Sequence, residues 1–458
     1  MSNARSRRRA VDGLEKLPTT EQEWYDKIVA YGLADATLQD LCSYALAKGR
    51  FSASTVPKEA FLIVRCIWPA ELPPRDALPY ILHTGSFFNE EHAKQATQML
   101  QDRDKYNPLG FSKLDTLFDV ICDECKTPRQ YQCSLAQELG PFSVLVSLKN
   151  QIMDKSPLTT GMDEPNLGDF APRKKLYRDA SQPSSSSAQL PDFSPTPRPK
   201  RARGEDRDTM DEDGTVQRYA PAPDIELADE IWDEIPAPRT PTETLVVDFM
   251  VSFLAGIACL LQPLSTRSVC VANAYETTYR FGPVRRGSDP APPPADEIQF
   301  RARIDGSIPF CRPQPHNLTE VVIFEAKRAP RMPGQSYAAV KGQQSMEHVA
   351  YIWKKHEKDP TPRRPSTYHT FMIAQDFLSF YITIGTYDNK YLEYIFGLGA
   401  TPVVLPTERK GFLQVQEFGP FEVSDRSHME ELRDIILCLM VWQLEGTKEG
   451  FIIREALS

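Results

Sequence analysis

Residues Asp305–Lys327 read DGSIPFCRPQPHNLTEVVIFEAK, and they decide the fold that we expect around them. The run Val321–Phe324 contains no polar residue, which is typical of a strand that is buried on both faces. Because side chains of a strand alternate between its faces, Glu325 and Lys327 should project together while Ala326 projects the other way. A carboxylate and an ammonium therefore end a core strand side by side, where burial requires that they be paired or hold a metal ion.

A second carboxylate is expected at the same place. The segment RIDGSIPF around Asp305 precedes a Pro-rich turn, so it predicts a strand that pairs as a hairpin with the strand ending at Glu325. Two carboxylates with hard oxygen donors suit Mg²⁺ or Mn²⁺, and Lys327 beside them can orient or activate a water molecule. The sequence therefore predicts a divalent-cation site at Asp305 and Glu325.

This arrangement resembles the motif of the PD-(D/E)XK nuclease superfamily, which includes restriction endonucleases and RecB-type nucleases. More narrowly, it resembles the PD-(D/E)XK nuclease-like proteins of fungi. Asp305 matches the first acid, and the segment Glu325–Lys327 matches (D/E)-x-K, with Ile304 where the motif has proline. The resemblance implies a restriction-endonuclease-like α/β core, in which helices flank a central mixed sheet. It also implies Mg²⁺-dependent hydrolysis of phosphodiester bonds in nucleic acid, with DNA favoured over RNA.

The resemblance covers roughly residues 240–458 and implies a role for each motif residue. Asp305, Glu325 and Lys327 would be catalytic. The metal ligands would be the Asp305 and Glu325 carboxylates and the Ala326 carbonyl. Basic residues after the motif would hold the nucleic-acid backbone, namely Arg328, Arg331 and Lys341.

An accessory acid is also expected, because the first core helix of the superfamily often carries one facing the active site. Glu243 and Asp248 are the two candidates. The plainer interpretation of Glu243 is a capping box, with Thr240 as the N-cap and Pro241 at the first helical position. The apolar segment that follows, Leu245–Leu264, is long enough to span a membrane, but Asp248 interrupts it and a buried core helix is the better interpretation.

A second helix is predicted from Tyr337 to Glu357, directly after the motif. RecB-type relatives place a glutamine near the start of this helix, where it binds substrate or assists the metal site. Gln343 and Gln344 occupy that position, with Glu347 close by. The alternative is a polar helix face exposed to solvent.

Further alternation of apolar residues predicts that the sheet continues beyond this helix. Residues 368–375 and 377–387 have the pattern of paired strands, and Met429–Leu444 that of a helix lying across them. The segment from residue 240 onward is therefore expected to be an α/β domain.

Residues 14–150 carry apolar residues at helical spacing and are expected to form an α-helical domain of unknown role, for which a protein partner is a candidate. Cys122 and Cys125 have the spacing of a zinc half-site, and Cys133 follows. No fourth ligand is close in sequence, so buried thiols are the alternative.

Residues 157–238 are first rich in Pro and Ser and then acidic, which predicts a disordered linker. Between Gly204 and Pro236 twelve Asp or Glu stand against two Arg, a net charge of −10. Since the whole chain carries −9, the remainder sums to −9 − (−10) = +1. The overall acidity therefore does not exclude a nucleic-acid partner.

Two features bear on the cellular compartment. Lys200, Arg201 and Arg203 form a basic cluster within the linker, which predicts a nuclear localisation signal, although a solvated charge run is the alternative. Nine cysteines in a chain without a signal-peptide pattern favour a reducing compartment. We expect the nucleus, with the cytoplasm as the alternative.

A competing hypothesis is a non-catalytic interaction protein that uses a nuclease-like fold as a scaffold. The intact pattern of Asp305, Glu325 and Lys327 argues against a decayed site.

Overall fold

The computed structural model describes one compact unit, formed by parts of Met1–Gly161 and Arg239–Ser458. A second unit, Met162–Pro238, contributes no described residue, so the expected linker and the basic cluster at Lys200, Arg201 and Arg203 lie outside the described residues. The described ranges are residues 16–38, 40–41, 51–102, 110–123, 137–154, 241–264, 272–282, 284, 300–309, 320–327, 335–360, 367–398 and 411–445.

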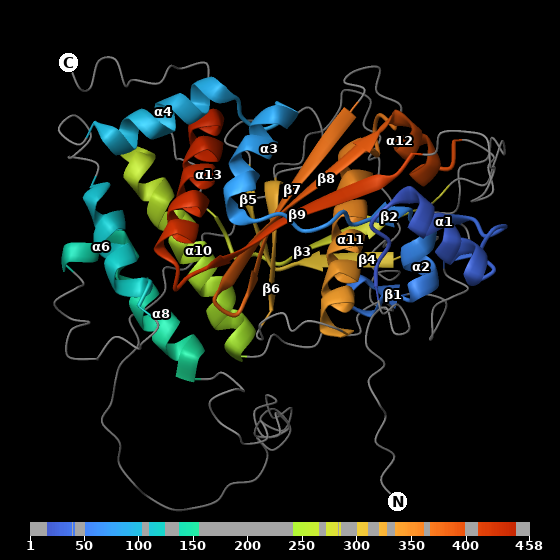
Figure 1. The fold of residues 1–458 in the computed structure, drawn as a ribbon, viewed down its shortest axis with the longest axis horizontal. Helices are drawn as coiled ribbons and strands as arrows, with labels where there is room; N and C mark the ends of the chain where they lie inside the picture. Colours follow the sequence, from blue (N-terminus) through green and yellow to red (C-terminus); the bar gives the residue numbers. More distant parts are fainter. Residues whose placement is uncertain are drawn as a thin grey trace, which may run out of the picture. The chain divides into compact units, whose positions relative to one another are not determined.

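A six-stranded mixed sheet is the centre of the fold, with strand order β2-β9-β8-β7-β6-β5 (Figure 1). Antiparallel pairs join β5 to β6, β7 to β8 and β8 to β9, and parallel pairs join β6 to β7 and β2 to β9. The α/β class with a mixed sheet and the hairpin of β5 with β6 agree with the sequence prediction. The strands are β2 (Cys66–Ile67), β5 (Gly306–Pro309), β6 (Glu320–Lys327), β7 (Thr367–Asp376), β8 (Ser379–Asp388) and β9 (Leu413–Glu422).

A smaller sheet has the strand order β1-β4-β3. It consists of β1 (Phe51–Ser52), β3 (Thr277–Phe281) and β4 (Phe300–Ile304). β4 ends at Ile304 and β5 of the main sheet begins at Gly306. Asp305 is therefore the single residue at which the chain passes from one sheet to the other.

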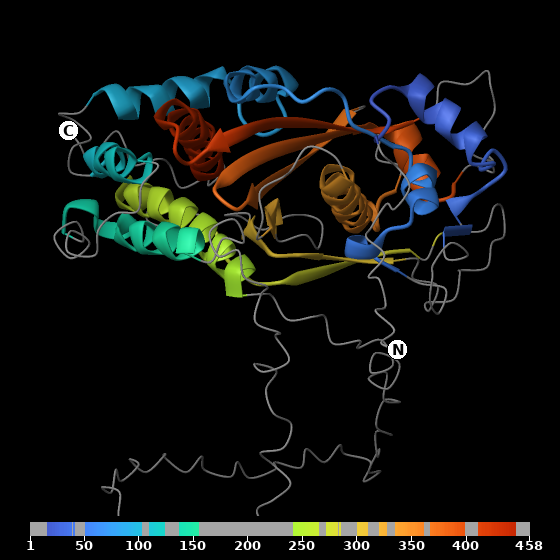
Figure 2. The ribbon, with the colours of Figure 1, turned by 60° about the horizontal axis from the view of Figure 1, so that its bottom comes forward.

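The two faces of the main sheet bury separate cores. On one face, α10 (Pro241–Leu261) and α13 (Arg426–Glu445) pack with Val322, Phe324 and Ala326 of β6. On the other face, α11 (Gln335–His356) packs with Ile323. Figure 2 shows α11 between the main sheet and the strands β3 and β4. This division follows the alternation of side chains along β6, so Glu325 and Lys327 lie on the α11 face with Ile323.

Among the described residues, one helical segment is long and apolar enough to cross a membrane: Glu243–Leu264, which begins in α10 and ends with the 3₁₀ helix Gln262–Leu264. Most of that segment is buried. The ring centroids of Phe249 and Phe253 lie 6.2 and 6.1 Å, respectively, from the ring centroid of Phe380 on β8. Its place in the core accounts for the apolar composition.

Seven further α-helices and four short 3₁₀ helices are described, several with side-chain caps. Thr20 accepts a hydrogen bond from Glu23 N at the start of α1, and Asp388 accepts one from Tyr391 N at the start of α12. The α-helices are α1 (Glu21–Ala30), α2 (Lys58–Ile63), α3 (Ala77–Thr84), α4 (Glu90–Gln101), α6 (Ser112–Ile121), α8 (Ser143–Asp154) and α12 (Asn389–Ile395). The 3₁₀ helices are η2 (Ala53–Thr55), η3 (Pro74–Asp76), η5 (Gly140–Phe142) and η9 (Gln262–Leu264).

The expected separation of an N-terminal helical domain, residues 14–150, from the α/β part is wrong. β1 and β2 complete the two sheets, so the N-terminal part is not wholly helical either. Trp24 and Phe61 belong to the core beneath α11, and Phe118 belongs to the core of α10 and α13. The apolar stripes of these helices are buried against the C-terminal half, which is why periodicity alone could not reveal where they pack.

Residues 63–70 are hydrogen-bonded to both α12 and β9. The Tyr391 hydroxyl donates to the Val64 carbonyl at 2.9 Å, and Gln416 Nε2 donates to the Ala70 carbonyl at 2.8 Å. Trp68 Nε1 donates to Ser345 Oγ on α11 at 2.8 Å. This N-terminal segment therefore helps to fix α11 against the sheet.

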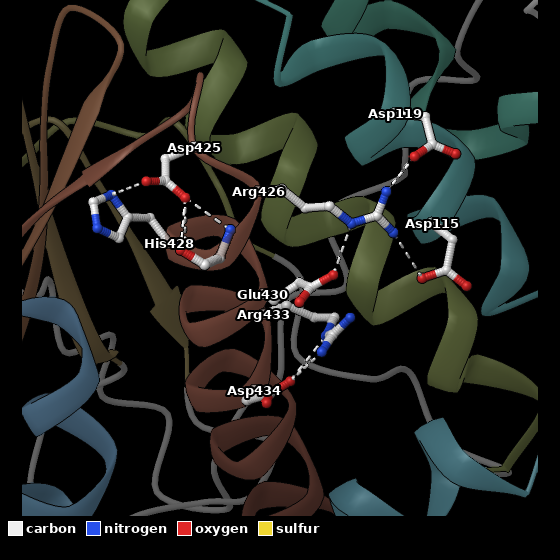
Figure 3. A network of polar contacts seen from close by, with 9 residues as sticks. Asp115, Asp119, Asp425, Arg426, His428, Glu430, Arg433 and Asp434 are labelled. Atoms are coloured by element: carbon white, nitrogen blue, oxygen red, sulfur yellow. Dashed lines mark hydrogen bonds and ion pairs between the residues drawn. The ribbon is translucent and has the colours of Figure 1, made fainter.

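An ion-pair network connects the N-terminal helix α6 to α13 at the surface (Figure 3). The Arg426 guanidinium pairs with Asp115 at 3.7 Å, with Glu430 at 2.9 Å, and with Asp119. These groups are partly exposed, so the network contributes less to stability than the apolar contacts beneath it.

We expect Trp68→Phe to lower the free energy of unfolding by about 1–3 kcal/mol, because it removes a buried donor from Ser345. Urea unfolding of Trp68→Phe, Ser345→Ala and the double variant would measure the coupling, expected at about 1 kcal/mol. Trp442→Phe, at a half-buried position on α13, is the matched control. Strictly additive effects of Trp68→Phe and Ser345→Ala would show that this contact does not hold α11.

The shared cores also predict how the chain behaves when it is cut. A site for a specific protease, inserted between residues 181 and 187, would divide the chain outside the compact unit. After cleavage the two fragments should elute together in size-exclusion chromatography and part only in denaturant, because each alone would expose its half of both cores. Two separately eluting, folded fragments would contradict the single unit.

Candidate active site

Asp305 is held at the crossing between the two sheets. Its backbone N–H donates to the Phe324 carbonyl at 2.9 Å, and the next residue, Gly306, lies against the backbone of Asn273. A Cβ atom at Gly306 would stand 2.2 Å from the Asn273 carbonyl oxygen, so only glycine permits this approach. The geometry fixes the direction in which the Asp305 side chain leaves the sheet.

The Asp305 carboxylate closes the link to the motif on β6. Its Oδ2 accepts a hydrogen bond from Ala326 N at 2.9 Å, across twenty-one residues of sequence. Asp305 is only 8% exposed. The structure thus brings Asp305 to the end of β6, beside Glu325 and Lys327.

Glu325 and Lys327 form an ion pair on the α11 face of the sheet. The Glu325 side chain is 2% exposed, whereas that of Lys327 is 25% exposed. Removing one partner of a buried ion pair strongly destabilises the folded protein, because the other charge is left unpaired. Solvent therefore reaches the site from the side of Lys327.

α11 contributes a second layer of polar groups to the same site. Gln343 Nε2 donates to Glu325 Oε1 at 2.5 Å and to Glu347 Oε1 at 2.8 Å, so one amide joins two carboxylates. Glu347 is fully buried, and its Oε2 has no hydrogen-bond partner within the described part of the chain. Asp305, Glu325, Lys327, Gln343 and Glu347 together make the group that we term the acidic cluster.

The charges of the acidic cluster shift one another's pKa values. Burial raises the pKa of Glu325 to about 7; the ammonium of Lys327 opposes this rise, and the carboxylate of Asp305 adds to it. Burial, and then the charge of Glu325, raises the pKa of Glu347 well above its ordinary value. Burial alone would lower the pKa of Lys327, but the surrounding carboxylates outweigh it and hold that pKa above its usual value.

The polar face of α11 continues beyond the acidic cluster towards β8 and β9. Lys341 Nζ forms a buried ion pair with Glu417 Oε2 at 2.5 Å. His348 lies between Thr370 and Thr383, with its ring nitrogens 2.8 and 2.9 Å from their hydroxyl oxygens. The expectation that Lys341 contacts a nucleic-acid backbone is therefore wrong, because Glu417 is fully buried and Lys341 supplies its counter-charge.

The accessory residues expected from sequence divide into two groups. Gln343 reaches the acidic cluster, and Gln344 is fully buried beside it in sequence, so a solvent-exposed polar face is the wrong description of this helix. Glu243 and Asp248 belong to α10, which packs on the opposite face of β6. Their expected accessory role stays a prediction.

Several expected residues lie outside the described residues. Arg328 and Arg331, expected to contact nucleic acid, are among them, as are Cys125 and Cys133 of the zinc hypothesis. Cys122 is described as a free, half-buried thiol whose pKa burial raises to about 11.

The donor chemistry of the acidic cluster fits a hard divalent cation. Within the described residues, no three His, Cys, Asp or Glu side chains already have metal-binding geometry. Glu325 instead accepts hydrogen bonds from Lys327 and Gln343. The buried Oε2 of Glu347, which has no hydrogen-bond partner among the described residues, is the observation that favours a cation, because a carboxylate oxygen without a donor is costly in the interior.

Glu347 is the residue that the motif did not assign. Its signal in the sequence is the spacing from Gln343, since residues four apart lie on the same face of a helix. That spacing could not show which face meets Glu325, because the contact depends on how α11 packs on β6.

Comparison with protein-family models and with curated proteins finds no match to this chain. The fold and the acidic cluster define an α/β protein with a buried acidic centre, and the nuclease superfamily remains a resemblance carried by Asp305, Glu325 and Lys327.

His348 predicts a dependence of stability on pH. Burial lowers its pKa from 6.5 to about 3, so between these values the unfolded chain binds a proton that the folded protein does not. The stability contributed by neutral His348 is complete above about pH 6.5 and is lost as the pH falls towards 3. The difference in unfolding free energy between wild type and His348→Gln should therefore shrink by up to about 1.4 kcal/mol per pH unit on acidification.

Urea unfolding at about pH 7, 6 and 5 measures this difference. Comparing the two proteins cancels the opposite trend of Glu325, whose raised pKa makes the fold more stable on acidification. Thr370→Val, which removes one of the same contacts without a titrating ring, should differ from wild type by a constant amount. A constant difference for His348→Gln as well would show that folding does not shift the pKa of this ring.

Proposed function

We propose that the chain is a metal-dependent nuclease that hydrolyses phosphodiester bonds at the acidic cluster. The observation that carries the proposal is the convergence of Asp305, Glu325 and Lys327 at the end of one core strand, through the Asp305–Ala326 hydrogen bond and the Glu325–Lys327 ion pair. This is the arrangement that the resemblance to the PD-(D/E)XK superfamily requires. The restriction-endonuclease-like core belongs to the same proposal.

Four residues of the acidic cluster have a task in this scheme. Asp305, Glu325 and the Ala326 carbonyl would hold Mg²⁺ or Mn²⁺, which would supply positive charge for phosphodiester hydrolysis. Lys327 keeps its proton among the carboxylates and stabilises the negative charge that develops on the phosphate. Gln343 orients Glu325 by its hydrogen bond.

In this proposal the substrate binds on the side of Lys327. Lys327 is the more exposed partner of the ion pair, and Arg328 and Arg331 lie within four residues after it in the chain. These residues supply the positive charge that a phosphate backbone requires, in place of Lys341. DNA is the favoured nucleic acid. The nuclear location, proposed from Lys200, Arg201 and Arg203, is consistent with such a substrate.

One observation favours the non-catalytic alternative. Glu325 is 2% exposed and Glu347 is fully buried. Such burial is also expected of a polar network that only stabilises the fold. The two hypotheses differ in whether a phosphate group can approach Lys327, and a test of cleavage separates them.

The full-length protein should cut DNA in the presence of Mg²⁺ or Mn²⁺ and not in EDTA. Lys327→Ala should lower the cleavage rate at least about 100-fold, because the ammonium acts on charge that develops in the transition state. Asp305→Asn should lower it comparably by weakening cation binding. Single- and double-stranded DNA and RNA, each labelled at one end, are the substrates to compare.

Lys354→Ala is the matched control, since Lys354 lies on α11 but pairs with the partly exposed Glu357. It should cleave at the wild-type rate. Unchanged cleavage by Lys327→Ala would remove the assignment of this motif, and a folded wild-type protein that cuts none of the four substrates would favour the scaffold hypothesis.

A further inference from the structure

Glu347 lies opposite the motif, on α11 and not on the motif strand. It is fully buried, and its Oε1 shares a single amide donor, Gln343 Nε2, with Glu325 Oε1. The donor–acceptor distances are 2.8 Å to Glu347 and 2.5 Å to Glu325. One NH₂ group therefore joins carboxylate oxygens from two different elements, β6 and α11.

The charges around this point do not balance. Glu347 interacts electrostatically with Glu325, Asp305 and Lys327, so three carboxylates share one ammonium. Another lysine of α11, Lys341, is already paired with the buried Glu417. Uncompensated negative charge in the interior is costly, and a bound cation relieves it.

The second oxygen of Glu347 distinguishes a ligand from a structural residue. A buried glutamate that serves only the fold normally has both oxygens hydrogen-bonded. Glu347 Oε2 is buried and has no such partner among the residues that the structure describes. Its two oxygens thus have unequal roles: one is oriented by Gln343, and the other is available to a ligand.

We propose that Glu347 is a third carboxylate ligand of the cation site, so that a divalent cation is held between β6 and α11 by Asp305, Glu325 and Glu347. The ligand is a small hard cation, Mg²⁺ or Mn²⁺, because the donors are carboxylate oxygens. The inference rests on the cation site of the proposed function but not on cleavage of nucleic acid. It also gives α11 a role: the cation links the helix to the motif strand.

Cation binding in the absence of nucleic acid tests this proposal. Thermal unfolding of full-length wild type, Glu347→Gln and Asp305→Asn would be followed while Mn²⁺ or Mg²⁺ is added. Wild type should show a rising midpoint. Glu347→Gln should unfold at the wild-type temperature or above it without metal, since one repelling charge is gone, and its apparent affinity for Mn²⁺ should fall at least about tenfold.

Glu357→Gln is the matched control, because Glu357 follows the same helix but pairs with Lys354 near the surface. It should keep the wild-type metal response. A Glu347→Gln protein with the wild-type metal response would overturn the proposal. Glu347→Asp, which keeps the charge on a shorter side chain, serves if Glu347→Gln fails to fold: weakened Mn²⁺ binding supports the proposal, and unchanged binding overturns it.

Failure of this inference and failure of the proposed function give different results. Mn²⁺ binding that depends on Glu347, in a protein that cuts no nucleic acid, would reject the nuclease and leave the third ligand in place. Cleavage that depends on Lys327, together with an unchanged Mn²⁺ response in Glu347→Gln, would support the nuclease and reject Glu347 as a third ligand.

Discussion

The cost of burying charge at the end of β6 is the constraint on which the rest of the structure depends. Glu325 and Lys327 end the central strand as an ion pair, and the Asp305 carboxylate is fixed beside them by the Ala326 N–H. Removing such groups from water is tolerated only when they are paired and hydrogen-bonded. The chain meets this requirement by crossing between its two sheets at Asp305, where Gly306 permits the close approach to Asn273.

The same constraint divides the main sheet into an apolar and a polar face. The face covered by α10 and α13 is filled by side chains such as Val322 and Phe324. The face covered by α11 contains Glu325, Thr383 and Glu417 in addition to apolar residues. These three contact Gln343, His348 and Lys341 of the helix, respectively. Directional contacts of this kind fix the rotation and register of a helix more strictly than apolar contacts do.

The N-terminal part of the chain belongs to this arrangement. Trp68 donates to Ser345 on the polar face of α11, and β2 extends the main sheet at β9. Helix α8 packs against α10, and α6 packs against α8 and α13. A helical region that appears independent in sequence thus supports the helix on which Gln343 and Glu347 stand.

The α/β class, the hairpin of β5 with β6 and the common face of Glu325 and Lys327 could be predicted from the sequence, because they follow from local patterns. The tertiary structure was needed to show that Lys341 pairs with Glu417 and that Gln343 joins Glu347 to Glu325. The physical reason is that each of these depends on which face of a helix packs against which strand. Contacts between segments far apart in the chain determine which face packs, so the sequence of one helix is not enough to predict it.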